Sequence, residues 1–136
     1  MVKVYFDASV IVSALISSSG GSAKLLGMVK EKIIMGITSQ TVIEEVLEHT
    51  EKIKLSSRTI QTYITNSGIL VRKKIAQNDI VPYKDLVDAE DAHVIAGAHM
   101  TNCHYLVTLD KKHLLVLQGK IKGIKIVNPK ELLAEV

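Results

Sequence analysis

Acidic side chains that follow apolar runs are the residues in this sequence whose positions most clearly point to chemistry. Asp7 ends the run 2–7, which predicts a core strand, and Asp110 follows a similar run at 104–108. Ligands of an open α/β sheet bind in the crevice outside the carboxyl ends of its strands, so these two carboxylates can share one site. The alternative is structural: Asp7, or Ser9 just after it, caps the helix that begins there.

A third acid lies on a helix. Residues 87–100 follow a helical period, and at about 100° per residue Asp91 falls in the middle of an apolar stripe. The stripe consists of Val87, Val94, Ile95 and Ala98. An ionised carboxylate on a buried face is costly unless a cation, N–H groups or a metal compensates it. Asp91 lies in the first turns, where the helix dipole favours negative charge, and Asp88 lies almost one turn earlier. Pairing of Asp91 with a core lysine or arginine is the structural alternative.

A fourth acid comes from the helix expected at 39–52, for which Ser39 is the predicted N-cap. The apolar face of this helix leaves Glu44 and Glu45 on its two flanks and Glu48 opposite, in solvent. Periodicity alone does not choose between Glu44 and Glu45.

Four carboxylates in one crevice require a counter-ion. Two unit charges about 4 Å apart repel by roughly 4 kcal/mol at an effective dielectric of about 20. All-oxygen, acidic ligation suits Mg²⁺ or Mn²⁺ and argues against zinc. The histidines form no zinc-like cluster in the sequence: His49, His99 and His113 are expected at the surface, and His93 and His104 have no assigned role.

Length and composition indicate one domain over residues 1–136, because the chain has 136 residues and is 47% hydrophobic. The net charge of +3 permits an anionic partner without requiring one. Cys103 is the single cysteine and is expected to be buried and inert. Since no apolar run reaches the length of a membrane span and the N-terminus lacks a signal-peptide pattern, a soluble cytoplasmic protein without a membrane partner is expected.

The alternation of strands and helices predicts the fold class. Strands are expected at 2–7, 33–38, 69–71, 104–108 and 124–127, and helices after residue 8, at 23–30, 39–52, 57–66, 87–100 and 111–115, and from Pro129 onward. A loop around Pro82 is expected at 80–86. The predicted fold is therefore an α/β, single-domain α/β/α sandwich with a parallel sheet of about five strands.

The order of these motifs resembles that of the PIN domain nucleases. Asp7 comes first, Ser39 follows with Glu45 six residues later, and the runs 88–98 and 107–110 come after them. The similarity extends from residue 2 to about residue 115. The length is similar to that of single-domain members of the family, including the VapC-type toxins of toxin–antitoxin pairs.

This resemblance implies a site and a reaction. It favours Glu45 over Glu44, and the catalytic, metal-binding acids that it implies are Asp7, Glu45, Asp91 and Asp110, with Mg²⁺ or Mn²⁺ as the cofactor. It also implies Asp88 as an auxiliary acid and Ser9 and Thr108 as supporting hydroxyls. The implied reaction is hydrolysis of RNA phosphodiester bonds to 3′-hydroxyl and 5′-phosphate ends. The implied partners are an RNA substrate, an antitoxin and a second copy of the chain in a homodimer.

Basic residues near these acids are the expected phosphate contacts. They are Lys111 and Lys112 after Asp110, and Arg72 and Lys73 in the run 72–74. A solvated strand end is the alternative for the run 72–74. Aromatic residues make up 4% of the chain, so there is little material for stacking RNA bases.

Other function classes remain as alternatives. A non-catalytic RNA-binding or scaffold module could use the same fold, although the intact acids count against it. A receiver domain would need paired acids after the first strand, where Asp7 stands alone. A haloacid-type phosphatase would need Asp-x-Asp, whereas Ser9 occupies the third position.

Overall fold

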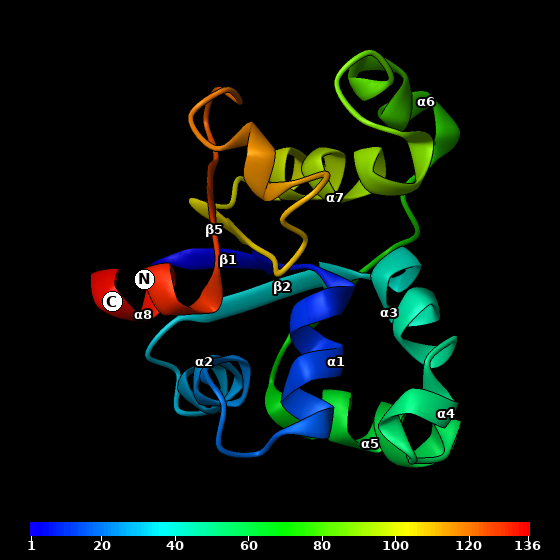
Figure 1. Cartoon of the computed structure of the whole chain (residues 1–136), viewed down its shortest axis with the longest axis vertical. Coiled ribbons are helices and arrows are strands. Elements are labelled where there is room, and N and C mark those ends of the chain that lie inside the picture. The colour runs from blue at the N-terminus through cyan, green and yellow to red at the C-terminus, as the bar shows by residue number, and fades with distance from the viewer.

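A five-stranded parallel sheet lies at the centre of the molecule (Figure 1). The structure, a computed structural model, describes residues 1–136 with the exception of the side chain of Ala89. The strand order is β3-β2-β1-β4-β5, and every neighbouring pair is parallel. The strands are β1 (Lys3–Phe6), β2 (Met35–Ser39), β3 (Leu70–Arg72), β4 (Tyr105–Val107) and β5 (Lys125–Val127). The predicted α/β fold with about five parallel strands is confirmed.

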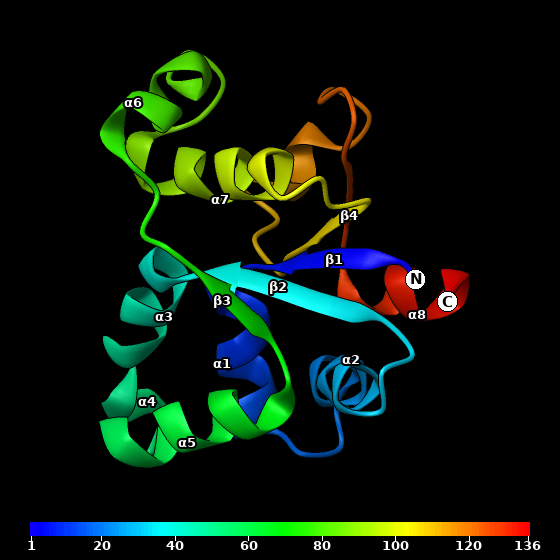
Figure 2. The ribbon, with the colours of Figure 1, turned by 180° about the vertical axis from the view of Figure 1, so that it is seen from behind.

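Helices cover both faces of the sheet (Figures 1 and 2). One face carries α1 (Ala8–Ile16), α2 (Gly21–Lys30) and α5 (Ser57–Ser67), with α3 (Gln40–Leu47) and α4 (Thr50–Ile53) beside them and α8 (Pro129–Glu135) packed on α2. The other face carries α7 (Ala89–Met100), which α6 (Gln77–Ile80) precedes. This is the three-layer arrangement expected when strands and helices alternate along a chain.

Strand register brings two chain exits to the same edge of the sheet. Phe6 at the end of β1 is the partner of Val107 at the end of β4. The ladder continues beyond both strands, because the backbone N–H of Asp7 donates to the carbonyl of Val107 at 3.1 Å. The backbone N–H of Thr108 donates in turn to the carbonyl of Val127 at 3.0 Å. Asp7 and the loop after β4 therefore leave the sheet side by side.

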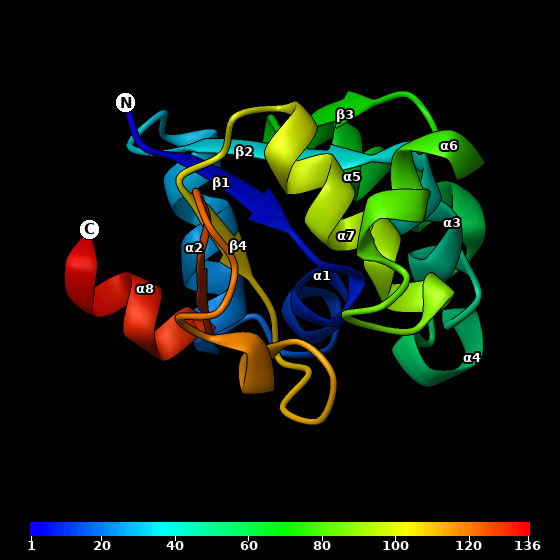
Figure 3. The ribbon, with the colours of Figure 1, turned by 90° about the horizontal axis from the view of Figure 1, so that it is seen from above.

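The centre of the core is β1, whose Val4, Tyr5 and Phe6 have no exposed surface. Figure 3 shows α7 above the sheet, next to the end of β1, with which it is in contact. Gly97 allows this close approach, since a Cβ built there would lie 2.5 Å from Cζ and 2.8 Å from Cε2 of the Tyr5 ring. The close contact fixes the height of α7, and with it the position of Asp91, above the sheet.

The helix expected at 39–52 is wrong in one respect, because the structure divides it into α3 and α4. Ser39 caps α3 as predicted, with its Oγ accepting from the N–H of Val42 at 3.3 Å. The helix ends because the N–H groups of Glu48 and His49 bond three residues back, to Glu45 and Val46, which tightens the last turn.

Two further expectations are wrong in detail. The loop expected at 80–86 contains the end of α6 and a 3₁₀ helix, η1 (Val81–Tyr83), in which Pro82 lies in the first turn, where its missing N–H costs nothing. The helix expected at 111–115 is a series of turns followed by a 3₁₀ helix, η2 (Leu115–Leu117). Asp110 caps the N–H groups of Lys112 and His113 as at a helix start, but the N–H of Leu115 bonds to the carbonyl of Asp110, five residues back, at 2.8 Å, so the α-helical pattern is not continued.

The remaining elements match their predictions to within two residues, and Cys103 is buried as expected. Among the described residues, no single helix has the length and apolarity to cross a membrane. Only the pair α1 and α2 reaches that length and composition, and this pair is bent by 100° between its two helices.

Candidate active site

The four acids singled out from the sequence line one pocket of about 580 Å³ at the carboxyl edge of the sheet. Each comes from a different element: Asp7 follows β1, Glu45 lies on α3, Asp91 lies in the first turn of α7, and Asp110 lies in the loop after β4. Ser9 also lines the pocket. The fold therefore brings together carboxylates that are separated by as much as a hundred residues in the sequence.

Asp7 is the most buried of these acids, with 7% of its surface exposed. Its Oδ2 accepts hydrogen bonds from the hydroxyls of Ser9 at 2.8 Å and Thr108 at 2.7 Å. Burial raises the pKa of Asp7, and the two hydroxyls oppose that shift because they stabilise the carboxylate. Although Asp7 precedes α1, its side chain makes no capping hydrogen bond to the described part of that helix. The capping alternative is therefore wrong.

The same two hydroxyls connect Asp7 to the loop that carries Asp110. Ser9 Oγ accepts from the N–H of Leu109 at 3.0 Å, and Thr108 Oγ1 accepts from the N–H of Asp110, also at 3.0 Å. Because each hydroxyl bonds both the Asp7 carboxylate and this loop, the two strand-exit acids are held in a fixed relation. The sequence placed Ser9 and Thr108 near the site, but only the structure shows these contacts.

Asp91 lies at the N-terminal end of α7, and 22% of its side chain is exposed. The pKa of Asp91 is raised, first by burial and then by the negative charge of Asp110, with smaller contributions from Asp7 and Asp88. Among the described side chains, the ion-pair partner available to Asp91 is His113, whose Nδ1 lies 3.9 Å from Asp91 Oδ2 and which carries charge only when protonated. The alternative of a core lysine or arginine partner is therefore wrong.

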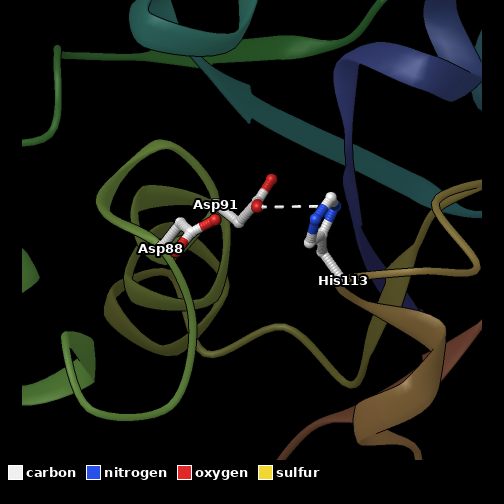
Figure 4. A group of neighbouring side chains, drawn as sticks. All are labelled: Asp88, Asp91 and His113. Atoms are coloured by element: carbon white, nitrogen blue, oxygen red, sulfur yellow. Dashed lines mark ion pairs between the residues drawn. The ribbon is translucent and has the colours of Figure 1, made fainter.

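His113 joins this group, although its position in the sequence gave no sign of it beyond its place three residues after Asp110. Its backbone N–H donates to Asp110 Oδ1 at 3.0 Å, and its Nδ1 lies 3.3 Å from Asp110 Oδ2. Potential ligand atoms of Asp88, Asp91 and His113 all lie within 4.8 Å of one another (Figure 4). The expectation that His113 is exposed is correct, since 43% of its side chain is accessible, but its contact with the acids was missed.

Glu44 and Glu45, which periodicity could not tell apart, have different surroundings. Glu45 lines the pocket, and its Oε1 pairs with Nε2 of His93, a residue of α7 that is 4% exposed. Glu44 points elsewhere and pairs with the exposed Lys74 at 2.9 Å. The structure thus gives His93, left unassigned from the sequence, a contact with one of the four acids.

The basic residues predicted as phosphate contacts do not gather in one place. Lys111 lines a pocket adjacent to that of the acids, and Lys112 next to it is exposed. Arg72 and Lys73 line a separate pocket of about 660 Å³ over β3, on the side of the sheet that carries α7. The two pairs therefore cannot contact the same phosphate.

A family model for the PIN domain matches residues 3–112. The chain belongs to the PIN domain family. No curated protein matches the chain.

Solved structures support the PIN fold. VapBC2 from Rickettsia felis, bound to a DNA fragment from its promoter, aligns with a TM-score of 0.65 at 17% identity over 93% of this chain and 98% of that one. A toxin–antitoxin complex from Klebsiella pneumoniae aligns with a TM-score of 0.63 at 19% identity, covering 93% and 97%. FitAB bound to the IR36 DNA fragment aligns with a TM-score of 0.62 at 14% identity, covering 93% and 94%. At these identities the likeness shows the fold alone.

The donor groups of this PIN domain fit a divalent cation. Four carboxylates line the pocket together with Lys52 and His49, and repulsion between the carboxylates adds to burial in raising the pKa values of Asp7 and Asp91. A bound cation removes that repulsion, and oxygen donors are the ligands that Mg²⁺ and Mn²⁺ prefer. His113 at the edge of the group adds one nitrogen donor, which Mn²⁺ accepts more readily than Mg²⁺ does.

Proposed function

We propose that this PIN domain is a metal-dependent endoribonuclease that hydrolyses RNA phosphodiester bonds. One observation carries the proposal: four carboxylates from four elements line one pocket at the carboxyl edge of the sheet. A cluster of acids in which mutual repulsion contributes to raised pKa values is poorly suited to a purely structural role. It is well suited to hold cations against the phosphate of a substrate.

Each acid has a proposed role. Asp7, Asp91 and Asp110 hold Mg²⁺ or Mn²⁺ directly, and Glu45 does so directly or through a water. A bound ion of this kind lowers the pKa of a water ligand and neutralises charge that develops on the phosphate. Ser9 and Thr108 keep the Asp7 carboxylate in place through their hydrogen bonds.

Five further residues act around these acids in the proposal. Asp88 is an auxiliary acid beside Asp91. Lys111 and Lys112, which follow Asp110, contact substrate phosphates without regard to sequence. Arg72 and Lys73 are assigned to a more distant part of a long RNA, because they line a different pocket.

We also propose that the protein acts in the cytoplasm as the toxin of a toxin–antitoxin pair. Toxin–antitoxin complexes among the structures of similar fold support an antitoxin partner for this chain. A homodimer is supported by apolar side chains that one copy leaves exposed, notably Leu70 and Val71 on the edge strand β3 and Met100 at the end of α7. Co-purification with the product of the adjacent gene tests the antitoxin, and sedimentation equilibrium tests the dimer.

The nuclease proposal is tested by incubating the purified protein with a mixed pool of structured RNAs and Mg²⁺ or Mn²⁺. Cleavage should disappear in EDTA and in the Asp91→Asn variant. The matched control is Glu48→Gln, an exposed acid near the end of α3 that does not line the pocket. RNA binding without cleavage by folded, metal-saturated protein would refute the nuclease and favour the non-catalytic alternative.

A further inference from the structure

A second pocket opens directly beside the pocket of the acids. It has a volume of about 460 Å³ and lies among the end of α1, the start of α2, the loop after β4 and the start of α8. Ser13 and Leu109 line both pockets, so they form a shared wall. Leu109 immediately precedes Asp110, and Lys111 follows it in the second pocket. A ligand that occupies one pocket can therefore extend into the other without crossing a ridge of secondary structure.

The lining of the second pocket combines apolar walls with two cations. The walls are aliphatic and come from Leu109, Leu115, Pro129 and Leu133. Lys111 and Lys130 line the same pocket, and both residues are exposed. Among the described residues, no acidic side chain lines this pocket, in contrast to the neighbouring one.

Small polar groups complete the lining. Ser22, which is 4% exposed, and the half-buried Asn128 also line the pocket and carry hydrogen-bonding groups. Asn128 uses its Oδ1 to accept from the N–H of Glu131, so its amide N–H₂ is left as a donor. The pocket thus offers apolar surface, a few hydrogen-bonding groups and positive charge in one place.

We propose that this pocket is a nucleotide subsite, which takes the RNA nucleotide next to the phosphate that is cut. This inference rests on the proposed nuclease function. The flat faces of the base lie against the aliphatic walls, the edge of the base meets Ser22 and Asn128, and Lys111 and Lys130 bind the flanking phosphates.

The charge and size of the pocket favour a nucleotide over an apolar ligand. Because both lysines are exposed and hydrated, an apolar ligand gains nothing from them, whereas a nucleotide supplies a phosphate for them to contact as well as an apolar base face. The volume lies within the range of small-molecule sites, about 300–1,000 Å³. Because aromatic residues are absent from the described lining, the base is held by shape and edge contacts, and stacking on an aromatic ring does not contribute.

The subsite predicts a base preference at one position beside the cut. Leu133→Trp fills the pocket and should change the preference at that position alone, measured by sequencing the ends produced from an RNA library randomised around the cleavage site. Lys130→Ala should raise KM and leave kcat unchanged, because it removes a phosphate contact remote from the reacting atoms. Lys120→Ala is the matched control, since Lys120 is equally exposed and lines neither pocket.

Binding gives a readout that does not depend on activity. Binding of single-stranded RNA to the wild-type protein and to Lys130→Ala is measured in EDTA over a range of salt concentrations. The slope of log Kd against log salt should be shallower by about 0.7 for Lys130→Ala than for the wild type, as expected for one lost phosphate contact. Lys120→Ala should keep the wild-type slope. Lys130→Ala changes an exposed side chain, so the test holds even if Leu133→Trp fails to fold.

The outcomes separate the subsite from the nuclease. The subsite is supported by a changed base preference in Leu133→Trp or by a shallower salt slope in Lys130→Ala, provided that Lys120→Ala shows neither change. The subsite is refuted if the wild-type protein cleaves RNA in a metal-dependent way but Lys130→Ala and folded Leu133→Trp both behave like Lys120→Ala. The nuclease proposal would then still hold. Absence of metal-dependent cleavage by the wild-type protein overturns the nuclease, and a salt slope for Lys130→Ala equal to that of Lys120→Ala then overturns the subsite as well.

Discussion

Substitution of Gly97 by alanine tests how closely α7 packs on the sheet. The added Cβ would lie 2.5 Å from Cζ and 2.8 Å from Cε2 of Tyr5, and closer still to the hydroxyl oxygen. Such distances are below those that real Cβ atoms adopt, and Tyr5 has no exposed surface into which its ring could move. Either α7 lifts away from β1 or the tyrosine ring is forced from its position.

The magnitude follows from two opposing effects. Overpacking a core costs about 1–3 kcal/mol, whereas replacing a helical glycine by alanine gains about 1 kcal/mol. Because three atoms of Tyr5 lie within 3 Å of the added Cβ, the packing cost is taken at the upper end of its range, and the expected net loss at Gly97 is about 2 kcal/mol. With an unfolding entropy near 2.1 cal/mol/K per residue, a loss of this size in a 136-residue chain lowers Tm by roughly 7 °C.

The chain offers a matched control for this substitution. Gly27 lies inside α2, and a Cβ there would meet nothing within 4 Å. Gly27→Ala should therefore raise the free energy of unfolding by about 0.5–1 kcal/mol, because only the gain in helix propensity remains. Chemical denaturation of both variants, monitored by circular dichroism, measures the two changes.

A partial rescue sharpens the test. In the double variant with Tyr5→Phe, the closest atom is removed but Cζ and Cε2 remain, so part of the lost stability should return. If Gly97→Ala were as stable as Gly27→Ala, α7 would not be packed as closely on Tyr5 as the structure describes. The position of Asp91 above the sheet would then need another explanation.

Three further predictions concern single side chains. Metal-free Asp7→Asn should have a higher Tm than the wild type at neutral pH, because it removes a carboxylate whose pKa burial raises. This difference in Tm should shrink as pH falls through the raised pKa of Asp7 and vanish below the ordinary value of 3.8. A lower Tm for Asp7→Asn at neutral pH would contradict this account. His93→Gln should weaken Mn²⁺ binding by about 10–100-fold in isothermal titration calorimetry, because Glu45 loses the partner that orients it. Glu44→Gln, which alters a surface pair, should bind Mn²⁺ as the wild type does. Equal Mn²⁺ affinities of His93→Gln and the wild type would show that His93 does not support the site. Asn128→Ala should lower the free energy of unfolding by about 1 kcal/mol in urea denaturation, since it breaks the capping box at the start of α8. An unchanged urea midpoint would show that the cap contributes nothing to stability.

The fold and the positions of Asp7, Asp91 and Asp110 could be predicted from the sequence because the relevant signals are local, whereas Glu45 was favoured over Glu44 only by the family resemblance. A short apolar run that ends in Asp7 or in Asp110 marks a strand and its exit, and parallel pairing then brings the exits to one edge. The N-cap at Ser39 is likewise visible in a few residues. These features need no knowledge of which helix packs on which strand.

The contacts that could not be predicted depend on tertiary structure or on a single side chain. His93 meets Glu45 only because α7 and α3 flank the same pocket, and no spacing in the sequence records that fact. The side chain of Asp110 caps the N–H groups of Lys112 and His113 as at a helix start, but the N–H of Leu115 bonds five residues back to the carbonyl of Asp110, so the expected helix at 111–115 is not formed. The basic residues were grouped by charge, although Arg72 and Lys111 lie in different pockets.

The hydrogen bond between Asp7 and Thr108 joins residues 101 positions apart. During translation, a chain that has reached residue 100 already carries Asp7, Glu45 and Asp91, but β1 still lacks its β4 neighbour and Asp7 still lacks the Thr108 hydroxyl. The pocket therefore cannot assemble on a nascent chain until the segment around residue 110 has left the ribosome.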